Sequence, residues 1–385
     1  MAAQSSLVPD APRIGLYFTA VNRNSYLIAK TLALGGCKVF VRLEIPLEEL
    51  LARPDEPGFA EREYCSWLYS EEDIQIIHSG DDFPEVDALL YQMWHLLPQH
   101  TEELHAWMKM AAHVTAWNAN NHECSVWQNL RGELVSAIRF ARLLLWTRNV
   151  VMQSGRIFLR PTSLLAHSRR QGYFTHPKFL REPVLRAEMF SGGWEAAESR
   201  PVRLIFSGNP EPESRRRTVE SLRGFLQRRA DVRILNHYEE LPSQPAPTVG
   251  TNSVLWMVRA PVQDPLWYLR RDVIPPAKWP AVMRLCDFAF CPPGDERKTH
   301  RVVESMLQGV IPILDCPEEY DAGLRDGVNC LVVRQGRWQE AVQHALELSQ
   351  PEVQRLRQAV QSAALKHLHH AGTARNWLTR LGLLP

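Results

Sequence analysis

Two glutamates and several basic residues stand close together in the segment CPPGDERKTHRVVESMLQGVIPILD, residues 291–315. The carboxylates are Glu296 and Glu304, and the basic residues beside them are Arg297, Lys298, His300 and Arg301. The segment predicts a turn followed by a helix. A helix N-terminus presents unpaired N–H groups and the positive end of the helix dipole, which favours a phosphate, and neighbouring Arg and Lys side chains add charge-assisted hydrogen bonds.

Glu304 lies further along the same predicted helix, on the side that carries Arg301 and Gln308 and away from the apolar face of Val302, Val303 and Met306. A carboxylate there would repel a phosphate unless it bonded a neutral group, and ribose hydroxyls are such a group. The segment therefore predicts a nucleoside diphosphate site. The alternative is a solvated set of surface ion pairs, each worth roughly a few tenths of a kcal/mol.

A second basic segment follows the apolar run 202–208, which ends at Gly208. Glycine lets the backbone turn close to a ligand. One of Arg215, Arg216 and Arg217 could then reach a diphosphate. Because three consecutive arginines cannot share one helix face, a solvated basic helix is the alternative.

Short β-branched or aromatic runs alternate with helical patterns, which is typical of βαβ units and parallel sheets. Strands are expected at residues 13–18, 37–42, 73–78, 86–93, 202–208, 231–235, 253–258, 286–291, 310–315 and 329–333. Helices are expected at 25–36, 125–149 and 214–230, and a hairpin at 150–161. The charged, proline-rich stretch 168–201 marks a domain boundary. We expect an α/β chain with Rossmann-like domains at 1–190 and 200–385, the last helix packing back on the first domain.

The segment 286–314 resembles the C-terminal signature of exostosin-like glycosyltransferases, in which a strand and a Pro-Pro-Gly-Asp turn lead to an arginine, an acidic residue, a glycine and an Ile-Pro-Val strand. The matching residues are Asp295, Arg301, Glu304, Gly309, Ile311 and Pro312, with Glu304 where aspartate is commoner. In place of the small residue common after that turn stand Glu296, Arg297 and Lys298. Glu296 and Glu304 also match the E-x7-E spacing of retaining glycosyltransferases.

Both families have the GT-B fold, with two facing Rossmann-like domains and a nucleotide sugar held mainly by the C-terminal one. The segment 204–222 also resembles the first βα unit of that domain in exostosin-like proteins. The resemblance implies a glycosyltransferase whose donor is a nucleoside diphosphate sugar. The implied donor-binding residues are Gly208, Arg215, Gly294, Asp295, Glu296, Arg297, Lys298, Thr299, Arg301 and Glu304. Two alternatives stay open: a non-catalytic nucleotide- or carbohydrate-binding GT-B protein and a GT-B nucleotide-sugar epimerase.

The acceptor site and any general base are expected in the N-terminal domain. Residues 19–26 lack the glycine-rich turn of a dinucleotide site. The segments 93–100 and 117–127 follow strands and offer His95, His122 and Glu123 among aromatic residues. An inverting transferase needs such a group to deprotonate the acceptor hydroxyl, whereas a retaining one does not.

Composition excludes several other classes of protein. Lys and Arg number 44 against 43 Asp and Glu, so no global field favours nucleic acid or an anionic membrane. Seven cysteines without a CxxC pair indicate reduced cytoplasmic usage and no zinc site. Because no DxD pair follows a strand near the nucleotide loops, we expect a metal-independent enzyme without a cofactor. Its acceptor, which could be a glycan, a lipid-linked sugar, a protein or a small molecule, stays unidentified, and no transmembrane segment is expected.

Overall fold

The chain divides into two compact units, each described by itself. The computed structural model describes residues 11–18, 23–43, 46–52, 65–66, 68–78, 81–92, 98–118, 149–152, 156–159, 169–170, 199–208, 210, 213–241, 252–258, 274, 278–293, 299–320 and 322–381. The N-terminal unit comprises Met1–Arg170 with Thr373–Pro385, and the C-terminal unit comprises Gln171–Gly372. The division between residues 170 and 171 falls at the start of the stretch 168–201 in which the sequence predicts a domain boundary.

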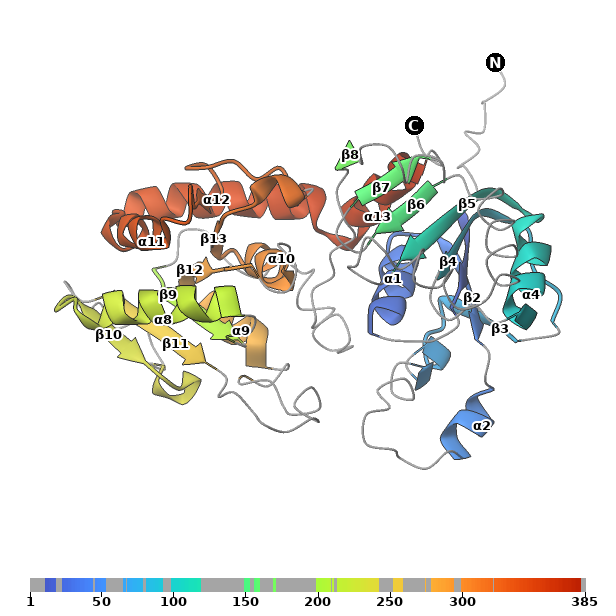
Figure 1. Ribbon diagram of the computed structural model, residues 1–385, viewed down its shortest axis with the longest axis horizontal. Coiled ribbons are helices and arrows are strands. Elements are labelled where there is room, and N and C mark those ends of the chain that lie inside the picture. The colour runs from blue at the N-terminus through green and yellow to red at the C-terminus, as the bar shows by residue number, and fades with distance from the viewer. Residues whose placement is uncertain are drawn as a thin grey trace, which may run out of the picture. The chain divides into compact units, whose positions relative to one another are not determined.

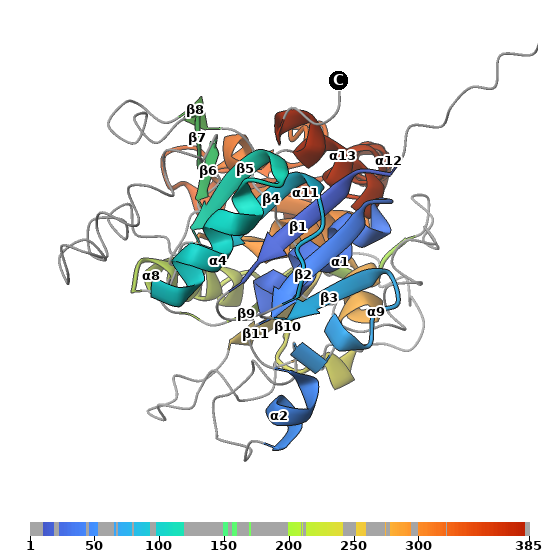
Figure 2. The same ribbon diagram turned by 90° about the vertical axis from the view of Figure 1, so that its right-hand side faces the viewer.

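One sheet forms the centre of the N-terminal unit, in the order β3-β2-β1-β4-β5-β6-β7-β8. Its strands are β1 Arg13–Tyr17, β2 Lys38–Leu43, β3 Ile74–His78, β4 Val86–Gln92, β5 Ala111–Asn118, β6 Asn149–Met152, β7 Arg156–Leu159 and β8 Arg169–Arg170. Neighbours from β3 to β6 are parallel (Figure 2), and β7 and β8 continue antiparallel. The order up to β6 is that of a Rossmann sheet. The antiparallel pair β6 and β7 confirms the hairpin predicted at 150–161.

Helices α1 (Arg23–Leu34) and α4 (Pro98–Met108) cover opposite faces of this sheet (Figure 1), and α2 spans Leu47–Ala52. On the face of α4, Trp107 is fully buried among large side chains such as Tyr17, Leu89 and Leu104. Helix α1 is followed by a glycine pair in which Gly36 has a φ of 88°, a backbone conformation that favours glycine. The predicted helix 125–149 lies outside the described residues except for Asn149, which begins β6.

The last helix, α13 (His370–Leu381), packs against the end of α1 in the N-terminal unit. A Cβ atom added to Gly35 would lie 2.2 Å from the Cβ of Ala374, so glycine permits the close approach of the two helices. Ala374 and Leu378 are buried. The chain thus enters the C-terminal unit after β8 and returns to the N-terminal unit at its end.

The C-terminal unit contains a parallel sheet in the order β10-β11-β9-β12-β13-β14. Its strands are β9 Val202–Gly208, β10 Val232–Leu235, β11 Asn252–Val258, β12 Cys286–Phe290, β13 Ile311–Leu314 and β14 Leu331–Val332. The helices around it (Figure 1) are α8 Glu213–Gln227, α9 Trp279–Arg284, α10 His300–Leu307, α11 Trp338–Glu347 and α12 Gln350–His367, and the 3-10 turns are η3 Tyr238–Glu240 and η6 Pro317–Glu319. Every strand predicted in this unit is present.

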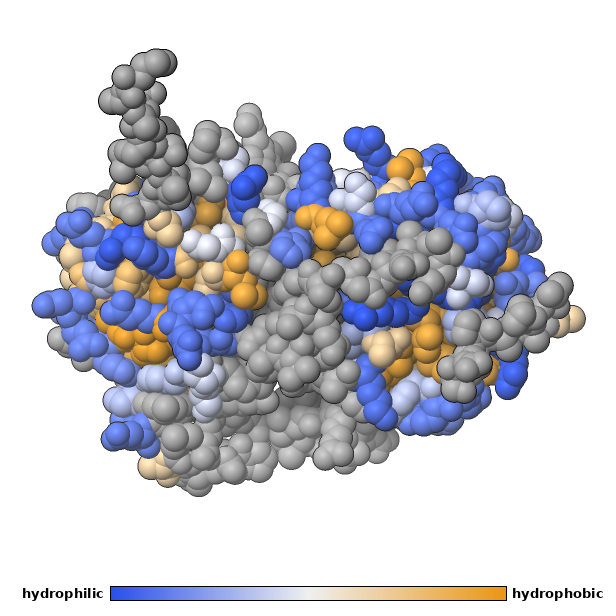
Figure 3. All heavy atoms as spheres, turned by 180° about the vertical axis from the view of Figure 1, so that it is seen from behind, coloured by the Kyte–Doolittle hydropathy of each residue, from blue (hydrophilic) through white to orange (hydrophobic). Residues whose placement is uncertain are grey.

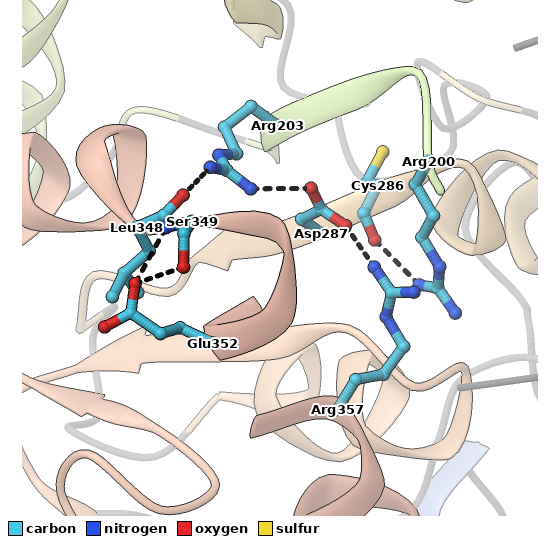
Figure 4. A network of polar contacts seen from close by, with 8 residues as sticks. All are labelled: Arg200, Arg203, Cys286, Asp287, Leu348, Ser349, Glu352 and Arg357. Carbon is cyan, nitrogen blue, oxygen red and sulfur yellow. Dashed lines mark hydrogen bonds and ion pairs between the residues drawn. The ribbon is translucent and has the colours of Figure 1, made fainter. Parts of the chain in front are cut away.

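A buried cluster of charges holds α12 to the sheet of the C-terminal unit (Figure 4). Asp287 of β12 accepts hydrogen bonds from Arg357 of α12 and, at 3.1 Å, from Arg203 of β9. Arg203 also donates to the carbonyl of Leu348, and Arg200 donates to two nearby carbonyls at 2.7 and 3.1 Å. The cluster lies at the amino ends of β9 and β12. Ligands of parallel sheets bind at the opposite, carboxyl ends, so this cluster has a structural role.

The described surface is polar with small apolar areas, as Figure 3 shows for one face. The exposed large hydrophobic side chains among the described residues are Met110, Val328 and Leu365. Within the part of the chain that the structure describes, no helix is long and apolar enough to span a membrane. The architecture is α/β with two Rossmann-like units in succession along the chain, which confirms the predicted α/β fold class with two Rossmann-like domains.

Candidate functional site

The strand order of the C-terminal sheet reverses between the neighbouring strands β9 and β12. After β9 the chain adds β10 and β11 on one side, and from β12 onward it adds β13 and β14 on the other. Open α/β sheets bind ligands beyond the carboxyl ends of the strands at such a switch point. Gly208 ends β9 there, and Cys291 to Pro293 follow β12.

Arg215 of α8 connects the two segments that follow these strands. Its Nε donates a hydrogen bond of 2.8 Å to the carbonyl of Pro293, in the first part of the Pro-Pro-Gly-Asp turn. Arg216 and Arg217 instead pair with Glu213 at 3.3 and 3.0 Å on the outer side of the helix. Of the three arginines that the sequence left open, Arg215 therefore lies against the segment that follows β12, whereas Arg216 and Arg217 form ion pairs with Glu213.

Arg301, near the start of α10, lies beside the end of β9 with its charge held on an aromatic face. Its Cζ is 4.5 Å from the ring centroid of Trp279, and its Nη2 would lie 3.8 Å from a Cβ atom added to Gly208. The Nε of Arg301 is buried without a hydrogen-bond partner, and the guanidinium forms no ion pair with a described residue. Buried polar groups normally have partners. A half-buried cation without a carboxylate partner is therefore suited to an anionic ligand.

Glu304 lies on the next turn of α10 and is buried, with 3% of its surface exposed. Its Oε2 accepts a hydrogen bond of 3.2 Å from the indole Nε1 of Trp279. The alternative of a solvated ion-pair surface is thus wrong for this residue. The cause is tertiary packing, because α10 contacts both β13 and α12 and is buried on all sides from Val302 onward.

Thr299 precedes α10 and is held by a buried tyrosine. The hydroxyl of Tyr320 accepts a hydrogen bond of 2.7 Å from the Thr299 N–H and donates one of 3.2 Å to its carbonyl. Burial raises the pKa of Tyr320 well above its usual range, so the phenol stays neutral and can serve as both donor and acceptor. The Thr299 Oγ1 is buried without a partner, which places a second unsatisfied polar atom at the start of α10.

Cys291 lies directly after β12, near the same groups. Burial raises the pKa of its thiol to about 12, although Arg301 nearby acts in the opposite direction. The thiolate is the nucleophilic form of cysteine. Cys291 is therefore a packing residue rather than a nucleophile.

The structure brings together five of the predicted donor-binding residues: Gly208, Arg215, Thr299, Arg301 and Glu304. The other five, Gly294, Asp295, Glu296, Arg297 and Lys298, lie outside the described residues. So do the predicted catalytic residues His95, His122 and Glu123. In the segment 117–127, which was expected to follow a strand, the first two residues still belong to β5.

The sequence did not single out Trp279 or Tyr320. Trp279 is the first residue of the short helix α9. A tryptophan at such a position is expected to pack in the core and not to bind a ligand. No group of three or more His, Cys, Asp or Glu side chains suited to a metal occurs among the residues that the structure describes. Metal independence stays a prediction.

Comparison with known proteins found no matching family model and no matching curated protein. Among solved structures, the N-terminal domain of Candida albicans trehalose-6-phosphate phosphatase is similar at 10% identity and a TM-score of 0.49, covering 96% of each chain. Anabaena HepE in complex with UDP is similar at 14% identity and 0.49, covering 96% of this chain and 99% of HepE. A Rickettsia africae glycosyltransferase is similar at 10% identity and 0.49, covering 97% and 98%.

Proposed function

We propose that the C-terminal unit binds a nucleoside diphosphate sugar and that the protein transfers the sugar to an acceptor, as exostosin-like glycosyltransferases do. The observation that carries the proposal is Arg301. Its guanidinium lies on Trp279 at the carboxyl end of β9, with a buried Nε that has no partner and no ion pair to a described residue. A diphosphate supplies the missing negative charge and hydrogen-bond acceptors.

The other residues of the site bind different parts of the donor. Arg215 holds the turn after β12 and brings a second positive charge to the switch point. Glu304, whose Oε2 already has a neutral donor in Trp279, is suited to ribose hydroxyls rather than to phosphate. The unsatisfied Thr299 Oγ1 adds a hydroxyl at the helix start.

Leaving-group stabilisation is the chemistry that these residues support. When the bond between sugar and diphosphate breaks, negative charge grows on the diphosphate. Fixed positive groups in a half-buried site stabilise that charge without reorganising. Arg301 and Arg215 therefore assume the role that a metal ion has in other transferases, and the reaction needs neither a metal nor a cofactor. The acceptor binds to the N-terminal unit, where His122, Glu123 or His95 acts as the base if the configuration is inverted.

The test is a panel of UDP-, GDP- and ADP-sugars, each incubated with the protein with and without candidate acceptors, with free nucleotide as the readout. We expect release with one donor family and unchanged release in EDTA. Binding with neither release of nucleotide nor change of the donor supports the non-catalytic alternative, and conversion of the donor into its epimeric nucleotide sugar without net release of nucleotide supports the epimerase. Absence of any nucleotide binding overturns the proposal.

Two arginine variants test whether Arg301 binds the nucleoside diphosphate. Arg301→Gln should weaken binding of the nucleoside diphosphate about 10- to 150-fold, the loss of one hydrogen bond between charged groups. Arg217→Gln is the matched control, because Arg217 is 79% exposed and pairs with Glu213 on the outer side of α8. Equal affinities for the two variants contradict the assignment of Arg301.

A further inference from the structure

Trp279 contacts both charged groups of the site with different parts of one ring system. Its indole N–H donates to the Glu304 carboxylate at 3.2 Å, and its ring face lies 4.5 Å from the Arg301 Cζ. The side chain is buried, and it comes from α9, a separate helix. One rigid aromatic residue from a separate helix therefore contacts both the carboxylate and the guanidinium.

Without Trp279, the two charged residues have a competing arrangement. Arg301 and Glu304 are three positions apart on α10, the spacing at which opposite charges on a helix pair with each other. Such a pair would neutralise the cation meant for the diphosphate and occupy the carboxylate meant for ribose. The structure shows no ion pair between these two residues; instead Arg301 lies on the π face and Glu304 accepts from the N–H.

We propose that Trp279 is a positioning residue that keeps Arg301 and Glu304 apart and directs Glu304 toward the ribose hydroxyls of the donor. This role rests on the proposed nucleotide site. The N–H holds one carboxylate oxygen, so the carboxylate keeps one orientation when the ligand arrives. The ring face holds the guanidinium through a cation–π contact, which leaves its N–H groups available for the ligand.

The two parts of the indole are separable by substitution. Trp279→Phe keeps an aromatic face for Arg301 but removes the N–H that holds Glu304, whereas Trp279→Leu removes both. Trp256→Phe is the matched control. Trp256 is also buried in the same unit, but its Nε1 has no hydrogen-bond partner, so this substitution removes the same atoms without breaking a hydrogen bond.

The experiment measures dissociation constants by calorimetry for the tightest-binding of UDP, GDP and ADP, for its 2′,3′-dideoxy analogue and for inorganic pyrophosphate. The wild-type protein should prefer the ribose form over the dideoxy form about tenfold or more. In Trp279→Phe this preference should fall to near one, because the ribose form weakens about tenfold while the dideoxy form and pyrophosphate keep their affinities. Trp279→Leu should weaken pyrophosphate as well, and Trp256→Phe should retain the wild-type preference.

The outcomes separate this role from the proposed function. If the wild-type protein binds nucleoside diphosphates with a ribose preference that Trp279→Phe retains, the role of Trp279 is wrong and the site stands. A merely structural tryptophan would weaken the ribose and dideoxy forms equally, and that result also overturns the role. If the wild-type protein binds no nucleoside diphosphate, the proposed function fails and the role of Trp279 fails with it. Thermal unfolding of each variant shows that the compared proteins are folded.

Discussion

Replacing Glu304 gives the most direct test of the ribose assignment. In Glu304→Ala the site loses a buried carboxylate that is proposed to accept hydrogen bonds from ribose. A hydrogen bond to a charged group contributes about 1.5–3 kcal/mol, so the dissociation constant of the nucleoside diphosphate should rise about 10- to 150-fold. Calorimetry with UDP, GDP and ADP measures this change, and pyrophosphate, which has no ribose, should bind as before.

The structure also predicts a loss of stability for Glu304→Ala. Trp279 donates its buried N–H to Glu304, and without that acceptor the unsatisfied donor costs about 1–3 kcal/mol in the free energy of unfolding. Glu304→Gln is the matched variant, because a neutral amide oxygen still accepts from the indole. It should keep most of the stability and lose only about 2- to 10-fold in nucleotide affinity. Unchanged affinity of a folded Glu304→Ala protein for all three nucleotides refutes the ribose assignment.

Three further predictions concern the metal, the acceptor base and the buried charges. Activity should persist in EDTA, and a loss restored by Mn²⁺ or Mg²⁺ would reveal a metal ligand outside the residues considered. His122→Gln or Glu123→Gln should lower turnover about 10²- to 10⁴-fold while leaving donor binding nearly unchanged, whereas full turnover in both variants places the base elsewhere or indicates a retaining enzyme. Asp287→Ala leaves two arginines of the cluster in Figure 4 without their carboxylate. The free energy of unfolding, measured in urea, should fall by about 3–5 kcal/mol. A decrease below about 1 kcal/mol contradicts the structural role of that cluster.

Local patterns were sufficient for most strands because a buried parallel strand is a short β-branched or aromatic run between turn residues. They were insufficient for α4, because no helix is predicted at Pro98–Met108. Pro98 is the first residue of this helix, a position where its missing N–H costs nothing, so a start signal was present. Strand order was also beyond local patterns. In the C-terminal sheet β11 lies between β9 and β10, and that choice depends on how the connecting segments cross the sheet.

Local sequence patterns were also insufficient to predict the contacts of single residues in the site. Helical spacing correctly placed Arg301 and Glu304 on the same side of one helix, but spacing alone leaves a pair of opposite charges free either to pair with each other or to bind a ligand. What decides between these outcomes is Trp279, which precedes Glu304 by 25 positions and reaches it only because α9 and α10 both pack beside β12. Whether the two charged side chains pair with each other or bind a ligand therefore depends on tertiary packing against Trp279, a residue that belongs to no sequence motif.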